Sequence, residues 1–196
     1  MILNSKKFRK LLNIVMPCIC PAPLLYTGAA VVFQEVPDEI TLAISISGCT
    51  RNCEGCHSAH LREYKGRDML YDLEYLIESH PGITCVCFMG GDQNLRELKM
   101  ATKIIRQKFP DLKICLYTGE DDLEKVARYI CALSPDYIKW GSYMKWRGGL
   151  DSPTTNQRFI NIVYPYGYDN IDYSICHGMN HYFQKNLDAE IEGDND

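Results

Sequence analysis

The apolar residues between positions 41 and 140 form short runs that are separated by longer amphipathic segments. In the run 41–47, Leu42, Ile44 and Ile46 share one face because side chains alternate along a strand, and small or polar residues occupy the other face. Similar runs predict strands at 83–88, 113–117 and 137–140, with a further strand at 157–163. Helices are predicted at 70–79, 93–108 and 120–130. This alternation predicts an α/β fold of parallel strands with crossover helices packed outside.

Length and composition indicate one main domain. The chain has 196 residues, of which 46% are hydrophobic and 23% charged. We expect a core domain over 27–163, an atypical N-terminal extension over 1–26, and a C-terminal extension over 164–196 with an acidic tail. Residues 1–26 begin like a signal peptide, but Asn13 and Pro17 interrupt the short apolar stretch. No run approaches the roughly 20 apolar residues that cross a bilayer, and the net charge of −4 gives no support for nucleic-acid binding. Neither a membrane nor a nucleic acid is therefore expected as a partner.

The ten cysteines are many for this length. Cys85, Cys87 and Cys115 lie inside apolar runs, where free cysteine packs as a small hydrophobe. The chain also exceeds the size at which disulfides become necessary for folding. These observations favour a reducing, cytoplasmic location over a secreted disulfide framework.

Three further cysteines follow the first strand of the predicted parallel sheet. Cys49, Cys53 and Cys56 have the spacing C-x3-C-x2-C, at the carboxyl end of the strand, where open α/β sheets and barrels bind ligands. A closed structural metal site takes four protein ligands, so three thiolates on one loop suggest a metal or cluster with an open position. Zinc with His57 or His60 as fourth ligand, or a redox pair of Cys53 and Cys56, are alternatives. An iron–sulfur cluster uses all three thiolates.

This motif resembles that of radical S-adenosylmethionine (SAM) enzymes. The resemblance implies that Cys49, Cys53 and Cys56 hold a 4Fe–4S cluster and that the amino and carboxylate groups of SAM complete its coordination. It also implies that an electron from the cluster cleaves SAM into methionine and a 5′-deoxyadenosyl radical. The expected cofactors are therefore a 4Fe–4S cluster and SAM.

A second motif, Gly90-Gly91-Asp92, follows the second predicted strand. Gly-Gly-Asp is common in plain turns, but glycines at a strand end also let a ligand approach the backbone closely. The segment is similar to the Gly-Gly-Glu segment of radical SAM enzymes, which holds the methionyl amino group. Here Asp92 stands where glutamate is usual.

Within that superfamily, the chain resembles the activating proteins of anaerobic, class III ribonucleotide reductases. The resemblance covers roughly residues 30–163. It is carried by the Cys-x-Gly-Cys loop, by Gly-Gly-Asp, by an aromatic-Thr-Gly end of the third strand, and by a closing Arg-Gly and Asn-Gln-Arg. These lie at 53–56, 90–92, 117–119, 147–148 and 156–158. Two departures are the insertion of 150–154 into the closing motif and His57, where tyrosine commonly follows the third cysteine.

The resemblance implies a glycyl-radical-generating oxidoreductase. Its partners would be the large glycyl-radical subunit of the reductase and an electron donor such as flavodoxin or ferredoxin. Gly55 and His57 would flank the cluster, and Tyr117 and Thr118 would contact SAM. No catalytic side chain is expected beyond the cluster ligands. A full TIM barrel takes about 250 residues, so an incomplete, open β/α barrel is expected.

Two other functions remain open on the sequence. One is another short radical SAM enzyme, either a different glycyl-radical activase or a small-molecule enzyme such as a deazaguanine synthase, against which the Asn-Gln-Arg segment argues. The other is a non-catalytic metal or redox adaptor. The aromatic and basic residues of 137–147 are interpreted as a half-buried strand and solvated turn, with a docking surface as the alternative. Cys176, His177 and His181 suggest either a metal site or, more commonly, an unstructured tail.

Overall fold

A computed structural model describes residues 22–168 and 175–184. Its eight-stranded sheet has the order β3-β1-β2-β4-β5-β6-β7-β8. The strands are β1 (Leu25–Val32), β2 (Thr41–Ile46), β3 (Arg67–Asp68), β4 (Cys85–Met89), β5 (Lys113–Tyr117), β6 (Tyr137–Trp140), β7 (Arg158–Val163) and β8 (Ile175–Gly178). The helices are α2 (Met69–Glu78), α3 (Leu95–Lys108) and α4 (Leu123–Leu133), with short 3-10 turns η1 (Ala59–Arg62), η2 (Asp92–Asn94) and η4 (Asn180–Tyr182).

The four central strands confirm the predicted parallel core. β2, β4, β5 and β6 pair side by side and in parallel, and the predicted strand at 157–163 is present as β7. The flanking pairs β1–β2, β1–β3, β6–β7 and β7–β8 are antiparallel, which the sequence pattern did not predict. The mixed α/β class is therefore observed, while closure into a partial barrel stays a prediction.

The expected domain limit at residue 27 falls inside β1, and β8 lies beyond the expected limit at residue 163. β1 begins at Leu25, and Leu24 is already buried, with its backbone N–H donating to Glu97 at 2.7 Å. The strand was missed because its sequence, with Gly28 beside a register shift, shows no clear alternation. β8 lies in the expected C-terminal extension. All of its residues are exposed, so its sequence shows no alternation between buried apolar and exposed polar positions that would predict a strand. Residues 1–21, 169–174 and 185–196 lie outside the described part of the chain.

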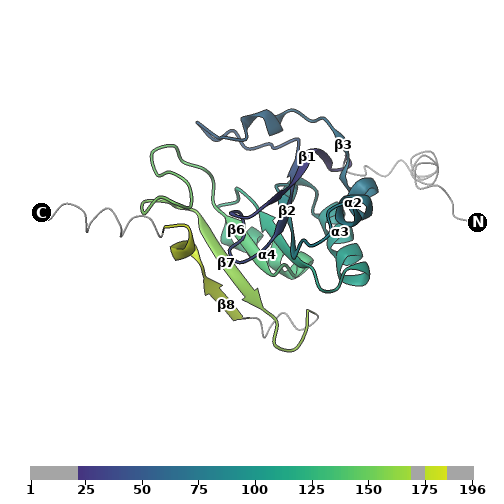
Figure 1. Ribbon diagram of the computed structural model, residues 1–196. Coiled ribbons are helices and arrows are strands. Elements are labelled where there is room, and N and C mark those ends of the chain that lie inside the picture. Colours follow the sequence, from purple (N-terminus) through teal and green to yellow (C-terminus); the bar gives the residue numbers. More distant parts are fainter. Residues whose placement is uncertain (1–21, 169–174, 185–196) are drawn as a thin grey trace, which may run out of the picture.

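The helices α2, α3 and α4 contribute to one core. Their apolar residues join Leu42, Ile44, Val86 and Leu116 on one side of the sheet. On the other side, a separate buried cluster contains Cys85, Cys87, Cys115, Val36, Tyr137 and Phe159, with no residue from these helices. Figure 1 shows α2 and α3 at one end of the molecule and β7 and β8 at the other. No residue of α2, α3 or α4 therefore covers this second face of the sheet, where loop residues such as Val36 pack against residues of the strands.

Capping side chains fix where each helix begins. Asp68 accepts from the N–H of Tyr71 at the start of α2, and Asn94 accepts from the N–H of Glu97 at the start of α3. α3 ends at Lys108, just before Pro110, as predicted. No helix in the described residues is both long and apolar enough to cross a membrane.

Candidate functional site

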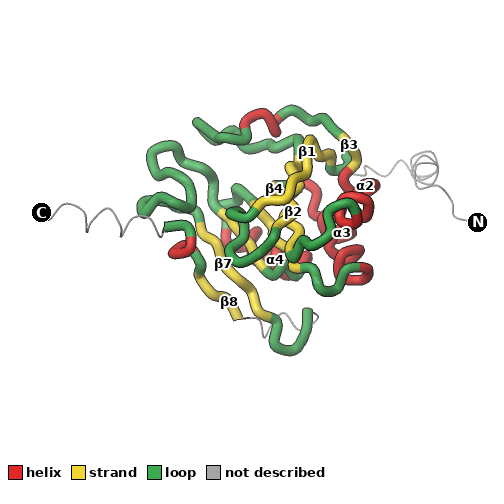
Figure 2. Tube along the Cα trace, in the orientation of Figure 1, coloured by secondary structure: helices red, strands yellow, loops and turns green. Residues whose placement is uncertain are grey.

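The cysteine loop follows the carboxyl end of β2. Gly48 and Gly55 have φ angles of 78° and 69°, the left-handed region that favours glycine, and they turn the chain on both sides of Cys53. The backbone N–H of Cys49 donates to Leu61 at 3.0 Å, and Arg62 donates to the carbonyl of Cys53 at 2.6 Å. In Figure 2 this green loop, with the short red helix η1, lies above the strands. These hydrogen bonds fold the loop back on itself.

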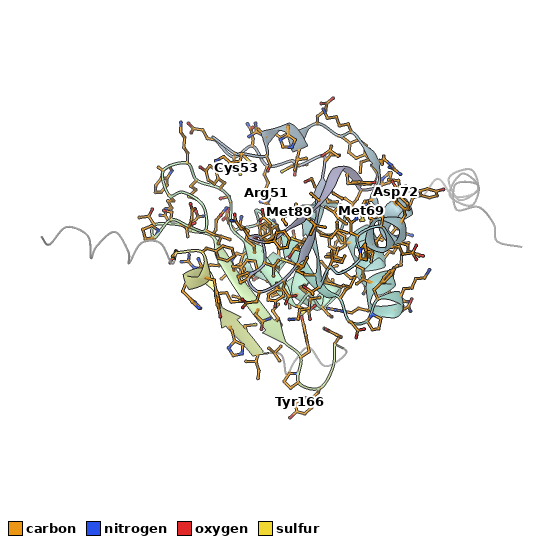
Figure 3. The ribbon with its side chains drawn as sticks, in the orientation of Figure 1. Arg51, Cys53, Met69, Asp72, Met89 and Tyr166 are labelled. Atoms are coloured by element: carbon orange, nitrogen blue, oxygen red, sulfur yellow. The ribbon has the colours of Figure 1, made fainter. Side chains whose placement is uncertain are left out.

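The loop meets the carboxyl ends of β4 and β5 at one cavity. Cys49, Cys53 and Cys56 line it together with the segments that end β4 and β5. All of the predicted site residues except Gly55 and His57 contribute to this lining: Cys49, Cys53, Cys56, Gly90, Gly91, Asp92, Tyr117 and Thr118. Cys53, Arg51 and Met89 lie in the same region in Figure 3, far from Tyr166. The cavity is thus built where the parallel strands β2, β4, β5 and β6 end.

The two glycines of the second motif adopt a backbone that other residues rarely reach. Gly90 and Gly91 have φ angles of 99° and 97°. The N–H of Gly90 donates to Tyr117 at 2.9 Å and so joins the ends of β4 and β5. A Cβ on Gly91 would lie 3.2 Å from Leu98 and 3.3 Å from Leu24. The glycines therefore allow both the turn and the close packing beneath Asp92.

An ion-pair network holds Asp92. Its Oδ2 lies 3.1 Å from Arg51 Nη2 and accepts from Thr118 Oγ1 at 2.8 Å. The same guanidinium nitrogen lies 2.9 Å from Glu120 Oε2. Burial opposes ionisation of Glu120, but the N–H of Asp122 and the Arg51 guanidinium outweigh it and lower the pKa of Glu120 to about 2. Sequence reasoning missed Arg51 and Glu120 as site residues.

Lys139 belongs to the run 137–147 that the sequence suggested as a strand and turn or a docking surface, and the structure places it in the cavity instead. It lines the cavity from β6, and its Nζ lies 3.4 Å from the carbonyl oxygen of Gly141 and 5.9 Å from the Tyr117 ring. Burial lowers the pKa of Lys139 to about 8, although the neighbouring Cys53 and Cys56 act in the opposite direction. A cation thus faces the cysteine thiols. From the strand pattern alone, Lys139 was predicted to be an ordinary strand residue without a role in the site.

A second cavity of about 1080 Å³ adjoins the first. The two share Cys56, Ser58, Tyr117, Lys139, Tyr143 and Gln157. His57 lines this second cavity, with its ring 5.6 Å from that of Tyr143. Gly55 instead packs against the stem of Lys145, where a Cβ would lie 3.2 Å from Cδ. The segment after β6 therefore covers the outer side of the cysteine loop.

Tyr117 and the Asn-Gln-Arg segment have visible structural partners. The hydroxyl of Tyr117 donates to the carbonyl of Glu35, and burial raises the pKa of Tyr117 well above its ordinary value. Asn156 Nδ2 donates to Ser142 at 2.9 Å, while buried Gln157 lines both cavities. Arg158 donates to backbone carbonyls of its own segment. The segment therefore anchors the loop after β6.

The remaining sequence candidates are separated from one another. In the run 137–147, Tyr137 is buried and Trp146 is 74% exposed, so the run does not form one continuous surface. Cys176 and His177 are exposed on β8, which corrects the expected unstructured tail at these positions. His181 belongs to η4. Within the described part of the chain, no three His, Cys, Asp or Glu side chains are grouped to hold a metal ion.

The cysteine loop offers the kind of ligand that an iron–sulfur cluster takes, although its three thiols are not gathered around one position as they would be for a single metal ion. Cys49, Cys53 and Cys56 carry free thiols, all partly or fully accessible, and they line one cavity. Thiolates are the ligands that such clusters take. Cys85, Cys87 and Cys115 are also free but completely buried. Among the cysteines of the described residues, those of the loop are therefore the ones that line this cavity together and could hold a cluster.

Comparison with known proteins points to the same class. Residues 40–130 match the model of a family described as a 4Fe-4S single cluster domain. The matched segment runs from β2 to α4 and so contains the cysteine loop, Gly90-Gly91-Asp92 and the end of β5. No curated protein and no solved structure gives a significant match to the chain. The match supports iron–sulfur binding and is consistent with a protein of the radical SAM type.

Proposed function

We propose that this protein is a radical SAM activase that generates a glycyl radical on the large subunit of an anaerobic ribonucleotide reductase. The observation that carries the proposal is the single cavity lined by the three cysteines and by Gly90, Asp92 and Tyr117. The match to a 4Fe-4S cluster domain supports the cluster. The choice of reductase rests on the resemblance of the aromatic-Thr-Gly and Asn-Gln-Arg segments.

The residues of the cavity divide between cluster and SAM. Cys49, Cys53 and Cys56 would hold the iron. The backbone of Gly90 and Gly91 would admit the methionine end of SAM, and the Asp92 carboxylate would pair with its ammonium group. When bound, the cluster supplies the electron that cleaves SAM to a 5′-deoxyadenosyl radical, which takes a hydrogen atom from the partner's glycine. Hydrogen-atom abstraction needs no general base, and we assign none.

The second cavity is a suitable entrance for the partner's glycine-bearing segment. It opens beside Cys56 and Tyr117 and so reaches the cysteine cavity from the sheet face without α-helices. Helices close the other face. An incomplete barrel with this open side would let a loop of a large partner approach the radical, and flavodoxin or ferredoxin would deliver electrons to the cluster.

Anaerobic reconstitution tests the proposal in two stages. The purified chain is incubated with iron and sulfide, then with SAM and a strong reductant, and 5′-deoxyadenosine is measured. The candidate reductase subunit is then added and the glycyl radical is sought by electron paramagnetic resonance. A cluster with SAM cleavage and a glycyl-radical signal is expected. Absence of a cluster and of SAM cleavage would refute radical SAM chemistry, whereas cleavage with a silent spectrum would refute only the assigned target.

A further inference from the structure

Arg51 connects strand ends that lie far apart in the sequence. It belongs to the cysteine loop after β2, yet its Nη2 reaches Asp92 after β4 and Glu120 after β5. The side chains of Asp92 and Glu120 are only 15% and 10% exposed. Water and salt therefore screen these pairs less than they screen surface ion pairs.

Asp92 keeps one carboxylate oxygen available. Both Arg51 and Thr118 contact Oδ2. The contacts of the described residues give Oδ1 no hydrogen-bond donor, and Asp92 lines the cavity. A cationic group in the cavity could therefore pair with Oδ1 without displacing Thr118.

Glu120 is a fixed anion on the other side of Arg51. Its Oε1 accepts from the backbone N–H groups of Asp121 and Asp122 at 3.1 and 3.2 Å, and its Oε2 faces Arg51 at 2.9 Å and, more distantly, Lys125 at 3.5 Å. With a pKa of about 2, Glu120 stays ionised at neutral pH. Asp92 and Glu120 thus compete for one guanidinium nitrogen.

We propose that Glu120 is a positioning residue that holds Arg51 partly away from Asp92, so that Asp92 remains able to bind the ammonium group of SAM. Arg51 at the same time ties the cysteine loop to the sheet. Without Glu120, Arg51 would pair fully with Asp92 and would repel an arriving ammonium group. This inference rests on the proposed use of SAM, but it assigns Glu120 and Arg51 a role that the cluster ligands do not provide.

The Glu120→Gln variant tests the proposal in the reconstituted protein. We expect SAM, measured by equilibrium dialysis, to bind about tenfold more weakly, the size of a weakened charge-assisted contact. Iron and sulfide content should not change. Binding of 5′-methylthioadenosine should not change either, because it lacks the amino-acid part of SAM. Glu124→Gln is the matched control, since Glu124 is an exposed carboxylate only four residues further along the chain, in the first turn of α4.

A double-mutant cycle with Arg51→Gln distinguishes positioning of Arg51 by Glu120 from a general effect of the Glu120 charge on SAM binding. If Glu120 acts through Arg51, Glu120→Gln should weaken SAM binding far less in the Arg51→Gln background. An equal loss in both backgrounds, or no loss in the single variant, would overturn the proposal and leave the proposed function intact.

Two further outcomes are also decisive. If Glu120→Gln fails to fold, judged by thermal melting, Glu120→Asp replaces it, because the shorter side chain keeps the charge but withdraws it from Arg51. If that variant binds SAM as tightly as the wild-type protein, the proposed positioning role of Glu120 is wrong. If the wild-type, cluster-loaded protein fails to bind SAM, both the positioning role of Glu120 and the proposed function are wrong.

Discussion

Gly119 provides the surface on which Arg51 lies. A Cβ at position 119 would be 2.6 Å from Arg51 Cδ and 3.1 Å from its Nε, and Gly119 is not among the glycines with positive φ. Gly119→Ala should therefore displace Arg51 rather than strain the backbone. We expect a loss of about 1–2 kcal/mol in the unfolding free energy of the apo-protein, measured by urea denaturation, and faster loss of iron to a chelator.

The control for this variant is Gly178→Ala in β8, where a Cβ would meet nothing within 4 Å. It should change the unfolding free energy by less than about 0.5 kcal/mol. If Gly119→Ala behaves like Gly178→Ala in both measurements, Arg51 is not held by this contact.

At the scale of residues, the sequence located the cysteines and Asp92 but not their partners. Cysteine spacing and Gly-Gly-Asp are local patterns, and their positions after strands predict that they meet. Arg51 and Glu120 are 69 residues apart, and their contact depends on the reach of two side chains across three strand ends. No local pattern encodes such a contact. The same reason explains why Lys139 was taken for an ordinary strand residue.

At the scale of elements, the start of α4 shows why boundaries are harder to predict than helices. The helix predicted at 120–130 would place the acidic run 120–122 in its first turn, but α4 begins at Leu123, with Asp122 in an extended conformation as its cap. Glu120 lies before the helix and turns toward Arg51. A charge pattern cannot distinguish a first turn from the capping segment before it, because acidic side chains favour both.

The Asp122 cap yields a direct prediction. Its carboxylate accepts from the N–H of Glu124 at 2.9 Å and of Lys125 at 3.4 Å. Asp122→Ala should lower the free energy of unfolding by about 1 kcal/mol, measured by urea denaturation. Asp122→Ser, which keeps a capping oxygen, should recover most of this loss. Equal losses in both variants would show that the side-chain cap does not stabilise α4.

At the scale of the whole molecule, buried ionisable groups set the response to alkaline pH. Tyr137 is 4% exposed and donates to Glu39 at 2.8 Å, and burial followed by this hydrogen bond raises the pKa of Tyr137 well above its ordinary value. The unfolded chain loses this proton near pH 10 while the folded chain keeps it, so stability falls as pH rises from about 9 to 11. Urea denaturation across this range should show the fall. The Tyr137→Phe variant should be less stable at neutral pH, but its free energy of unfolding should fall less steeply with pH. If the dependence of the unfolding free energy on pH is unchanged in this variant, Tyr137 is not the group responsible.

Thiol accessibility connects the whole fold with the proposed cluster. In the folded apo-protein, an alkylating reagent should modify Cys49, Cys53 and Cys56, because these thiols are at least partly accessible. Cys85, Cys87 and Cys115 should stay unmodified until denaturant is added, since they are buried and burial raises the pKa of Cys85 and Cys115, which lowers their thiolate fraction.

After reconstitution, the loop thiols should become protected, while Cys131 and Cys176, which are exposed and lie outside the cavity, should react as before. Peptide mass spectrometry of both forms gives the result for each cysteine. Protection of Cys131 or Cys176 together with the loop would indicate compaction or aggregation, whereas unprotected loop thiols in an iron-loaded protein would place the iron elsewhere.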